Sequence, residues 1–387
     1  MERDIYLDNS ATTRPYDEVI DYINYINASV YGNPSSLHTK GIEAERLIKK
    51  ARDIIAGSLG VEGREVYFTS GGTESNNLAI IGYLSANPRK GRHVITSKIE
   101  HPSVLETCRH LAENGYRVDY LDVDSKGIIN LGQLRDAINE DTALISIMVV
   151  NNEIGSVQPV EEIVKIKNAV NRNAVLHMDA IQAYGKIKLN PKKLGIDLLS
   201  ISSHKIHGPK GVGAVWANKT IRLKPILFGG GQESLIRSGT ENVSGIGGFG
   251  MASEMIFQRL EENFKKVAGL KSLFLKRLEE EIDDFHVNSP EDASPYILNV
   301  SFPDLKAEVL LHHLEEKGIY VSTGSACSSR KDTRSHVLQA INVDKCYAEG
   351  AIRFSFSSLN TEQDVLDTID ALKVIIPKIK IHKNRRR

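Results

Sequence analysis

The chain has 387 residues, a length that suits two domains. Of these residues 41% are hydrophobic and 25% charged, a composition typical of a soluble globular protein. Lys plus Arg and Asp plus Glu both number 49, so the formal net charge of 0 argues against nucleic acid or an anionic surface as the main partner. Three cysteines (Cys108, Cys327 and Cys346) are too few and too irregularly spaced for a disulfide framework, or for a zinc or iron–sulfur site held by this chain alone.

The first two thirds of the chain predict a largely parallel sheet covered by helices on both faces. Apolar residues at helical spacing predict a helix over residues 42–59, with Gly60 as its stop. Strand-like segments separated by helical ones follow at residues 65–70, 93–96, 143–150, 175–178, 198–202 and 212–216. This alternation is typical of the α/β class.

The last third predicts a smaller α+β domain. A long, charged amphipathic helix over residues 254–281 is expected to connect the two parts. It is followed by strands at 297–302, 319–322 and 351–356 and by helices at 307–317, 335–341 and 361–376. We therefore expect a large domain over residues 14–255 and a small domain formed by residues 1–13 and 256–387.

The two ends of the chain suggest where the protein works. The N-terminus has no apolar signal core, and no apolar run approaches the roughly 20 residues of a membrane span, so we expect a cytoplasmic protein with no membrane partner. Residues 378–387 are strongly basic. They are either a frayed, solvated tail or a contact for RNA or an acidic partner, although direct nucleic-acid binding is not expected of the chain as a whole.

Lys205 lies just past a strand that reads as buried and is followed by Gly208 and Gly211. Burial disfavours the ammonium form and makes the amine a nucleophile, which is what a Schiff-base lysine requires. The alternative is a lysine whose stem is buried while its charged end reaches solvent.

Residues 68–77 place two glycines and several hydroxyl side chains between a strand and a helix. This pattern predicts a phosphate cradle, because free backbone N–H groups at the start of a helix point at an anion. A plain N-capped helix is the alternative. The segment is not a P-loop, since no GxxxxGK[ST] motif occurs in the chain.

Two further candidates follow predicted strands. Asp179 ends one strand, where its carboxylate suits the protonated ring nitrogen of a cofactor, and a buried Asp satisfied by backbone donors is the alternative. His101 follows another strand and suits ring stacking or proton transfer, whereas a lone histidine is more often structural.

Together, these segments resemble the cysteine desulfurases of aminotransferase class V, the NifS/IscS type. The matching stretches lie at residues 6–13, 31–36, 68–77, 100–103, 151–159, 177–182, 200–211, 237–242, 324–327 and 352–355. The resemblance implies a transferase that depends on pyridoxal 5'-phosphate (PLP), with the aspartate aminotransferase-like fold of type I. Such a fold has a large, mostly parallel seven-stranded sheet and a smaller α+β domain, which would carry the loop of Cys327.

The resemblance also implies roles for individual residues. Lys205 would form the Schiff base with PLP, Asp179 would pair with the pyridine nitrogen, and Gln182 would donate to the phenolic oxygen. His101 would stack on the ring and assist proton transfer. Arg353 and Asn152 would hold the substrate carboxylate, a task that suits a guanidinium fork, with Asn152 also near the cofactor. The phosphate would be held by Gly72, Thr73, Ser202, Ser203, His204 and, from the second subunit of a homodimer, Thr240.

Cys327 separates a desulfurase from the other class V enzymes. Residues 324–334 are small, polar and basic, as in a mobile loop, and Arg330, Lys331 and Arg334 would favour the thiolate. We expect Cys108 to be an inert buried thiol within a helix and Cys346 to be a partly exposed spectator.

The activity implied is conversion of L-cysteine to L-alanine, with the sulfur held as a persulfide on Cys327. A sulfur-acceptor protein of iron–sulfur cluster assembly or tRNA thiolation would receive it, and the sequence does not separate these pathways. A role for Cys327 as ligand of a cluster shared with the acceptor also stays open. The alternatives are a selenocysteine lyase, a class V aminotransferase or decarboxylase in which Cys327 is incidental, and a scaffold that docks its partner through residues 378–387.

Overall fold

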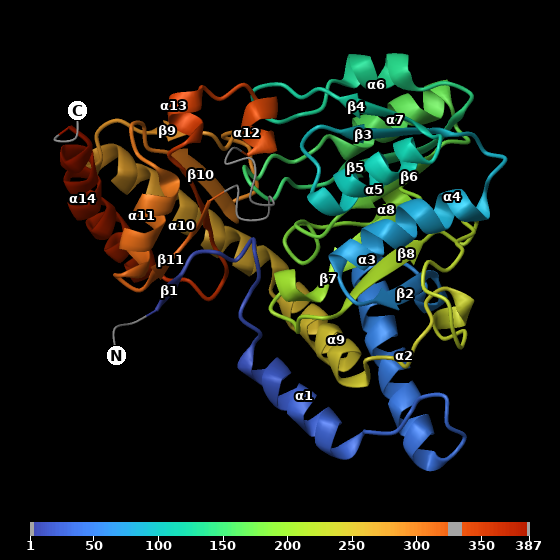
Figure 1. Ribbon diagram of the computed structural model, residues 1–387. Helices are drawn as coiled ribbons and strands as arrows, with labels where there is room; N and C mark the ends of the chain where they lie inside the picture. Colours follow the sequence, from blue (N-terminus) through green and yellow to red (C-terminus); the bar gives the residue numbers. More distant parts are fainter. Residues whose placement is uncertain (1–3, 324–334, 385–387) are drawn as a thin grey trace.

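The structure, a computed structural model that describes residues 4–323 and 335–384, is built around a seven-stranded sheet (Figure 1). Its strands are β2 (Val66–Thr69), β3 (His93–Ser97), β4 (Arg117–Leu121), β5 (Thr142–Met148), β6 (Val175–Asp179), β7 (Leu198–Ser202) and β8 (Gly213–Ala217). They lie in the order β2-β8-β7-β6-β5-β3-β4, and β8 alone runs antiparallel to its neighbours. The predicted α/β class with a mostly parallel seven-stranded sheet is confirmed.

Most helices of this part of the chain cover the sheet, and the first of them packs on the last. The helices are α1 (Asp17–Ser29), α2 (Thr39–Leu59), α3 (Gly72–Asn77), α4 (Tyr83–Ala86), α5 (Pro102–Glu113), α6 (Leu131–Ala137), α7 (Val160–Val170), α8 (Pro191–Leu194) and α9 (Val243–Gln258). Every residue of β3, β5, β6, β7 and β8 is buried, so both faces of the sheet are covered. The helix α2 stops at Gly60, whose φ of 68° suits glycine, as predicted.

A second, four-stranded sheet lies beside the first part (Figure 1). Its strands, in the order β12-β13-β10-β9, are β9 (His286–Val287), β10 (Ile297–Ser301), β12 (Ser322–Thr323) and β13 (Ala351–Ser355). The helices of this part are α10 (Leu260–Glu281), α11 (Ala307–Glu315), α12 (His336–Ala340), α13 (Lys345–Ala348) and α14 (Glu362–Asn384). Near the N-terminus, β1 (Ile5–Tyr6) pairs in parallel with β11 (Ile319–Tyr320), which joins the first residues to the last third of the chain. The domain boundaries themselves stay a prediction.

Two predicted elements need correction, and one strand was missed. The helix expected over residues 254–281 is two helices, α9 and α10, because the chain leaves helical geometry at Arg259, whose φ is −119°. The strand expected over residues 319–322 divides into β11 and β12, which belong to different sheets. The sequence analysis does not identify β4, a partly exposed edge strand with no continuous apolar run. Among the described helices, none has the length and apolar composition needed to cross a membrane.

Candidate active site

A cavity of about 490 Å³ lies where the carboxyl ends of the large sheet face the small sheet. The sequence-predicted residues that line it are Gly72, Thr73, His101, Asn152, Asp179, Gln182, His204, Lys205 and Arg353. Ser202 and Ser203 are buried but are not among its lining residues, and Thr240 is exposed. Cys327 lies outside the described residues.

Lys205 ends a short 3-10 turn (Ser203–Lys205) directly after the buried strand β7. Its Nζ donates to the backbone carbonyls of Ser10 (2.5 Å) and Ala11 (2.6 Å). Both acceptors belong to the N-terminal segment that follows β1, so distant parts of the chain meet at this amine. The sequence analysis gave no role to Ser10, although it lies within the first matching stretch.

Asp179 is the last residue of β6 and is buried. Its Oδ1 accepts the backbone N–H of Ile181 (2.9 Å), and its Oδ2 accepts from Asn76 Nδ2 (2.7 Å). Burial nevertheless raises the pKa of the Asp179 carboxyl group. A cation at this position, such as a protonated ring nitrogen, would supply the charge partner that favours the carboxylate. The sequence analysis gave no role to Asn76, although it lies within the matching stretch of residues 68–77.

His101 is the N-cap of α5, and its Nδ1 accepts the backbone N–H of Ser103 at 3.1 Å. Because a backbone N–H can only donate, the neutral imidazole carries its proton on Nε2. Burial, with smaller contributions from Lys205 and His336, lowers the pKa of His101 to about 4, so the ring is neutral near pH 7. The Ser103 hydroxyl also accepts from Asn76 (2.9 Å), the same asparagine that binds the buried carboxylate.

The predicted phosphate cradle lies at the start of α3. Gly71 has a φ of 151°, a backbone conformation that favours glycine. A Cβ atom added to Gly72 would lie 2.4 Å from the Ile181 side chain, so a larger residue does not fit at this position. The hydroxyl groups of Ser202 and Ser203 are buried and have no hydrogen-bond partner within the described residues. Neither serine lines the cavity, so the residues that could meet a phosphate here are Gly72, Thr73 and His204, which do line it. These residues therefore fit PLP.

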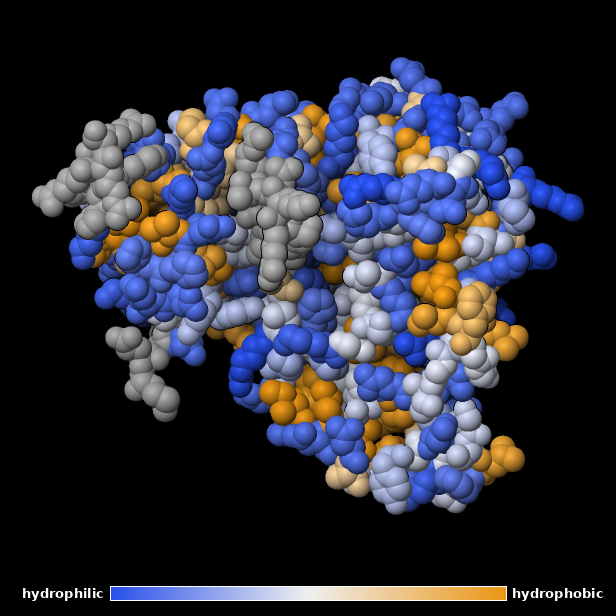
Figure 2. All heavy atoms as spheres, in the orientation of Figure 1, coloured by the Kyte–Doolittle hydropathy of each residue, from blue (hydrophilic) through white to orange (hydrophobic). Residues whose placement is uncertain are grey.

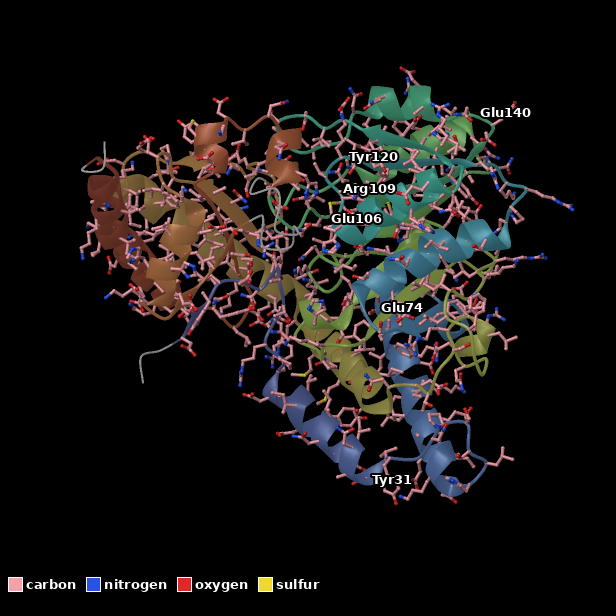
Figure 3. The ribbon with its side chains drawn as sticks, viewed as in Figure 1. Tyr31, Glu74, Glu106, Arg109, Tyr120 and Glu140 are labelled. Atoms are coloured by element: carbon pink, nitrogen blue, oxygen red, sulfur yellow. The ribbon has the colours of Figure 1, made fainter. Side chains whose placement is uncertain are left out.

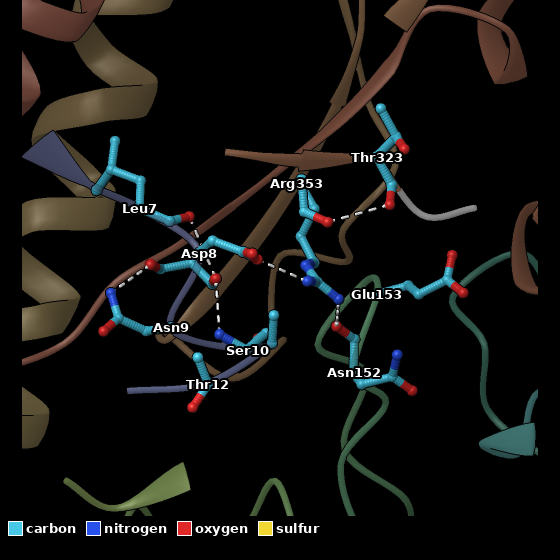
Figure 4. A network of polar contacts seen from close by, with 12 residues as sticks. Leu7, Asp8, Asn9, Ser10, Thr12, Asn152, Glu153, Thr323 and Arg353 are labelled. Atoms are coloured by element: carbon cyan, nitrogen blue, oxygen red, sulfur yellow. Dashed lines mark hydrogen bonds and ion pairs between the residues drawn. The ribbon is translucent and has the colours of Figure 1, made fainter. Parts of the chain in front are cut away.

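Arg353, in β13, is the centre of a polar network (Figure 4). Its Nη1 donates to the Asn152 carbonyl (2.9 Å), and its Nη2 forms an ion pair with Asp8 (2.8 Å). Its Nε is buried without a partner in the described part of the chain. Nη1 and Nη2 each carry a second N–H, so the guanidinium group keeps donors for a carboxylate while two other groups hold it. The sequence analysis did not identify Asp8.

Two further cavity residues were also missed, Glu153 and His336. Glu153 accepts from the Ser335 hydroxyl (2.5 Å), and burial raises the pKa of its carboxyl group. His336 Nε2 lies 2.9 Å from the backbone carbonyl oxygen of Glu100. No local pattern in the sequence could have indicated these contacts, because their partners are about 180 or more residues away.

The two described cysteines behave as expected. Cys108 is buried in α5, and burial raises the pKa of its thiol to about 12, so it stays protonated. Cys346 is exposed, and neither thiol lines the cavity. Across residues 4–323 and 335–384 there is no group of three or more side chains suited to hold a metal ion.

The comparison with known proteins defines the class to which this fold and site belong. The model of the aminotransferase class-V family matches residues 5–367. A cysteine desulfurase IscS of Dictyoglomus turgidum is 44% identical over 381 residues, which cover 98% of this chain and 96% of that protein. A cysteine desulfurase IscS of Methanosarcina thermophila is 43% identical, over 97% of this chain and 93% of its own length.

Solved structures agree with this result. A NifS-like protein superimposes with a TM-score of 0.92 at 40% identity, covering 97% of this chain and 100% of its own. The structure of SspA in complex with cysteine gives a TM-score of 0.82 at 35% identity, covering 92% of this chain and 99% of that one. The chain therefore belongs to the aminotransferase class-V family, as an IscS/NifS-like cysteine desulfurase.

Proposed function

We propose that this protein uses PLP to move the sulfur atom of L-cysteine onto Cys327, with release of L-alanine. The observation that carries the proposal is the cavity itself, which brings Lys205, Asp179 and Arg353 together. When bound, PLP supplies an electron sink that weakens bonds at the α-carbon of an amino acid. The structure of SspA with cysteine supports the choice of substrate.

The residues at one end of the cavity would hold the cofactor. Lys205, fixed by two carbonyl groups, would bond to it covalently. Asp179 would hold the ring nitrogen in its protonated form, which also supplies the buried carboxylate with a counter-charge. Gln182 would donate to the phenolic oxygen. His101, neutral and with its proton on Nε2, would stack on the ring and assist proton transfer by donating a hydrogen bond from Nε2.

The residues at the other end would bind and cleave the substrate. Arg353 and Asn152 would bind the carboxylate and so fix the position of the substrate thiol. The Cys327 thiolate would then attack the substrate sulfur atom, so that an S–S bond forms, the C–S bond breaks and the carbon takes up a proton. The products are L-alanine and a persulfide on Cys327. An acceptor protein of cluster assembly or tRNA thiolation would consume this persulfide.

We further propose a homodimer in which Thr240 of the second subunit completes the phosphate site. Several large apolar side chains are exposed on the part of the chain that carries the large sheet, namely Tyr31, Leu37, Phe228 and Leu235. Tyr31 lies in the loop between α1 and α2, at the end of the molecule away from the small sheet (Figure 3). Apolar surface also appears around α1 and α2 in Figure 2. Exposed apolar groups of this size suit a subunit interface.

The test is a reconstitution. The purified protein is incubated with PLP, its absorbance spectrum is recorded, and L-cysteine is added while alanine and sulfide are measured. We expect a visible cofactor band that changes on addition of cysteine, with equal amounts of alanine and sulfide when a reductant is present. A cofactor band with a keto acid or an amine as product would mean a different class V reaction. Absence of a cofactor band would overturn the proposal.

A further inference from the structure

Lys186 is a buried lysine that the proposed chemistry does not use. It is 4% exposed, and within the described residues no carboxylate forms an ion pair with it. Its Nζ donates to Gln182 Oε1 at 2.9 Å and lies 5.5 Å from the centre of the Tyr296 ring. Burying an ammonium group without an acid is costly, and burial accordingly lowers the pKa of Lys186 to about 7. Such a residue calls for a functional explanation.

The hydrogen bonds around Gln182 fix the orientation of its amide group. Lys186 donates to the amide oxygen, whereas the amide nitrogen donates to the Ser10 carbonyl at 2.9 Å. A carbonyl can only accept, so the amide nitrogen must face Ser10, and the amide oxygen then faces Lys186, which donates to it. The same Ser10 carbonyl accepts from Lys205 at 2.5 Å. The two lysines are therefore connected through Gln182 and Ser10.

We propose that Lys186 is a positioning residue, which holds the Gln182 amide with its nitrogen turned so that it can donate to the phenolic oxygen of PLP. This inference rests on the proposed function and extends it to a lysine that is not among the cavity-lining residues. Without Lys186, the amide oxygen loses its donor and the side chain is held at one end only. A donor to the phenolic oxygen would then be placed less well, and the cofactor would bind more weakly.

The test replaces Lys186 with methionine, which is similar in length and removes a buried charge without an acid partner, so folding should be retained. Lys271→Met is the matched control. Lys271 is 7% exposed, and burial lowers its pKa to about 8. Its Nζ donates to the backbone carbonyl of Ser294 at 3.3 Å, and Lys271 does not line the cavity. The readouts are the Kd for PLP of the cofactor-free protein and the visible spectrum of the bound cofactor at a fixed, mildly alkaline pH.

We expect Lys186→Met to raise the Kd for PLP about tenfold, which corresponds to about 1.4 kcal/mol. We also expect more of the bound cofactor in its long-wavelength, protonated form, because a phenolic oxygen that lacks its donor holds the proton of the Lys205 linkage more firmly. Lys271→Met should leave both readouts unchanged. An effect of equal size in both variants would overturn the proposal, and so would no effect in Lys186→Met.

A second pair of variants tests whether Lys186 acts through Gln182. In a Gln182→Leu background, Lys186→Met should change neither readout further, and an undiminished change there would overturn the proposal. Lys186→Gln keeps a donor for the Gln182 amide oxygen, so its Kd for PLP and its cofactor spectrum should be close to those of the wild type. If only this variant folds, a departure of its Kd and spectrum from the wild type would overturn the proposal. If the wild type itself does not bind PLP, the proposed function fails. If the wild type binds PLP and Lys186→Met binds it equally well, only the inference about Lys186 is refuted.

Discussion

Asp8 and Arg353 are 345 residues apart in the sequence, yet their side chains form an ion pair with 2.8 Å between Oδ1 and Nη2 (Figure 4). The side chains are 21% and 7% exposed, so the pair is screened less than one on the surface. Asp8 follows β1, and Arg353 lies within β13. The ion pair thus joins the N-terminal segment to the small sheet at the cavity wall and holds the guanidinium group before a substrate arrives.

Removal of this carboxylate should weaken substrate binding. In Asp8→Ala, the guanidinium group loses a charge-assisted hydrogen bond, an interaction worth about 1.5–3 kcal/mol. We expect the KM for L-cysteine to rise about tenfold while kcat changes much less, since a tenfold loss corresponds to about 1.4 kcal/mol. Steady-state kinetics of alanine release measure both quantities.

Asp17→Ala is the matched control for this prediction, because Asp17 pairs with Arg14 on the surface and its side chain is 71% exposed. It should leave KM unchanged. A lower KM in Asp8→Ala would show that Asp8 competes with the substrate carboxylate, which contradicts the positioning role.

The central part of the fold and site could be predicted because both follow local rules. A buried strand is a continuous apolar run, and a charged residue at its end or shortly after it, such as Asp179 or Lys205, stands out. The helix α9 was mostly missed because its first half is rich in glycine, where close approach of other helices replaces side-chain periodicity. A Cβ at Gly250, for example, would lie 2.7 Å from the Cβ of Ala51. The contacts of Arg353 with Asp8 and of Gln182 with Ser10 could not be predicted, since no local pattern encodes contacts across more than a hundred residues.

Replacement of the proposed sulfur acceptor should stop turnover without loss of the cofactor. In Cys327→Ser, the hydroxyl group cannot replace a thiolate as a nucleophile towards sulfur, so we expect no alanine release above background and an unchanged cofactor spectrum. The control is Cys346→Ser, which changes an exposed thiol outside the cavity and should retain wild-type activity. Equal activity in the two variants would remove Cys327 from the mechanism.

The buried carboxyl group of Glu100 should make stability depend on pH. Burial raises the pKa of Glu100 from 4.5 to about 8. Below pH 4.5 both the folded and the unfolded state bind this proton. Between pH 4.5 and about 8 the unfolded state releases this proton while the folded state keeps it. The free energy of unfolding therefore decreases as the pH rises through this range. We expect Glu100→Gln, which mimics the protonated group, to gain stability relative to the wild type over this range, by a few kcal/mol at most.

Denaturant unfolding at several pH values measures this difference. The control is Glu106→Gln, whose carboxylate pairs with Arg109 on the exposed face of α5 (Figure 3). Its stability relative to the wild type should not vary with pH in this range. A flat difference for Glu100→Gln as well would show that Glu100 is ionised in the folded protein.

The proposed homodimer predicts a clear effect of one surface substitution. Phe228 is 88% exposed, in the segment between β8 and α9, and its burial at an interface would stabilise the dimer by about 1.5–3 kcal/mol. Phe228→Asp should therefore shift the protein towards the monomer in light scattering. Val374→Asp, an exposed position on α14, should leave the mass unchanged. A wild-type protein of monomer mass would contradict the proposal.

The measurement that tests the central claim most directly is the mass of the peptide that contains Cys327 after a single turnover. The protein with bound PLP is mixed with less than one equivalent of L-cysteine, alkylated and digested, and the alanine released is counted. We predict that this peptide gains one sulfur atom for each alanine formed, whereas the peptides of Cys108 and Cys346 do not. Alanine release without added sulfur on Cys327 would contradict the account.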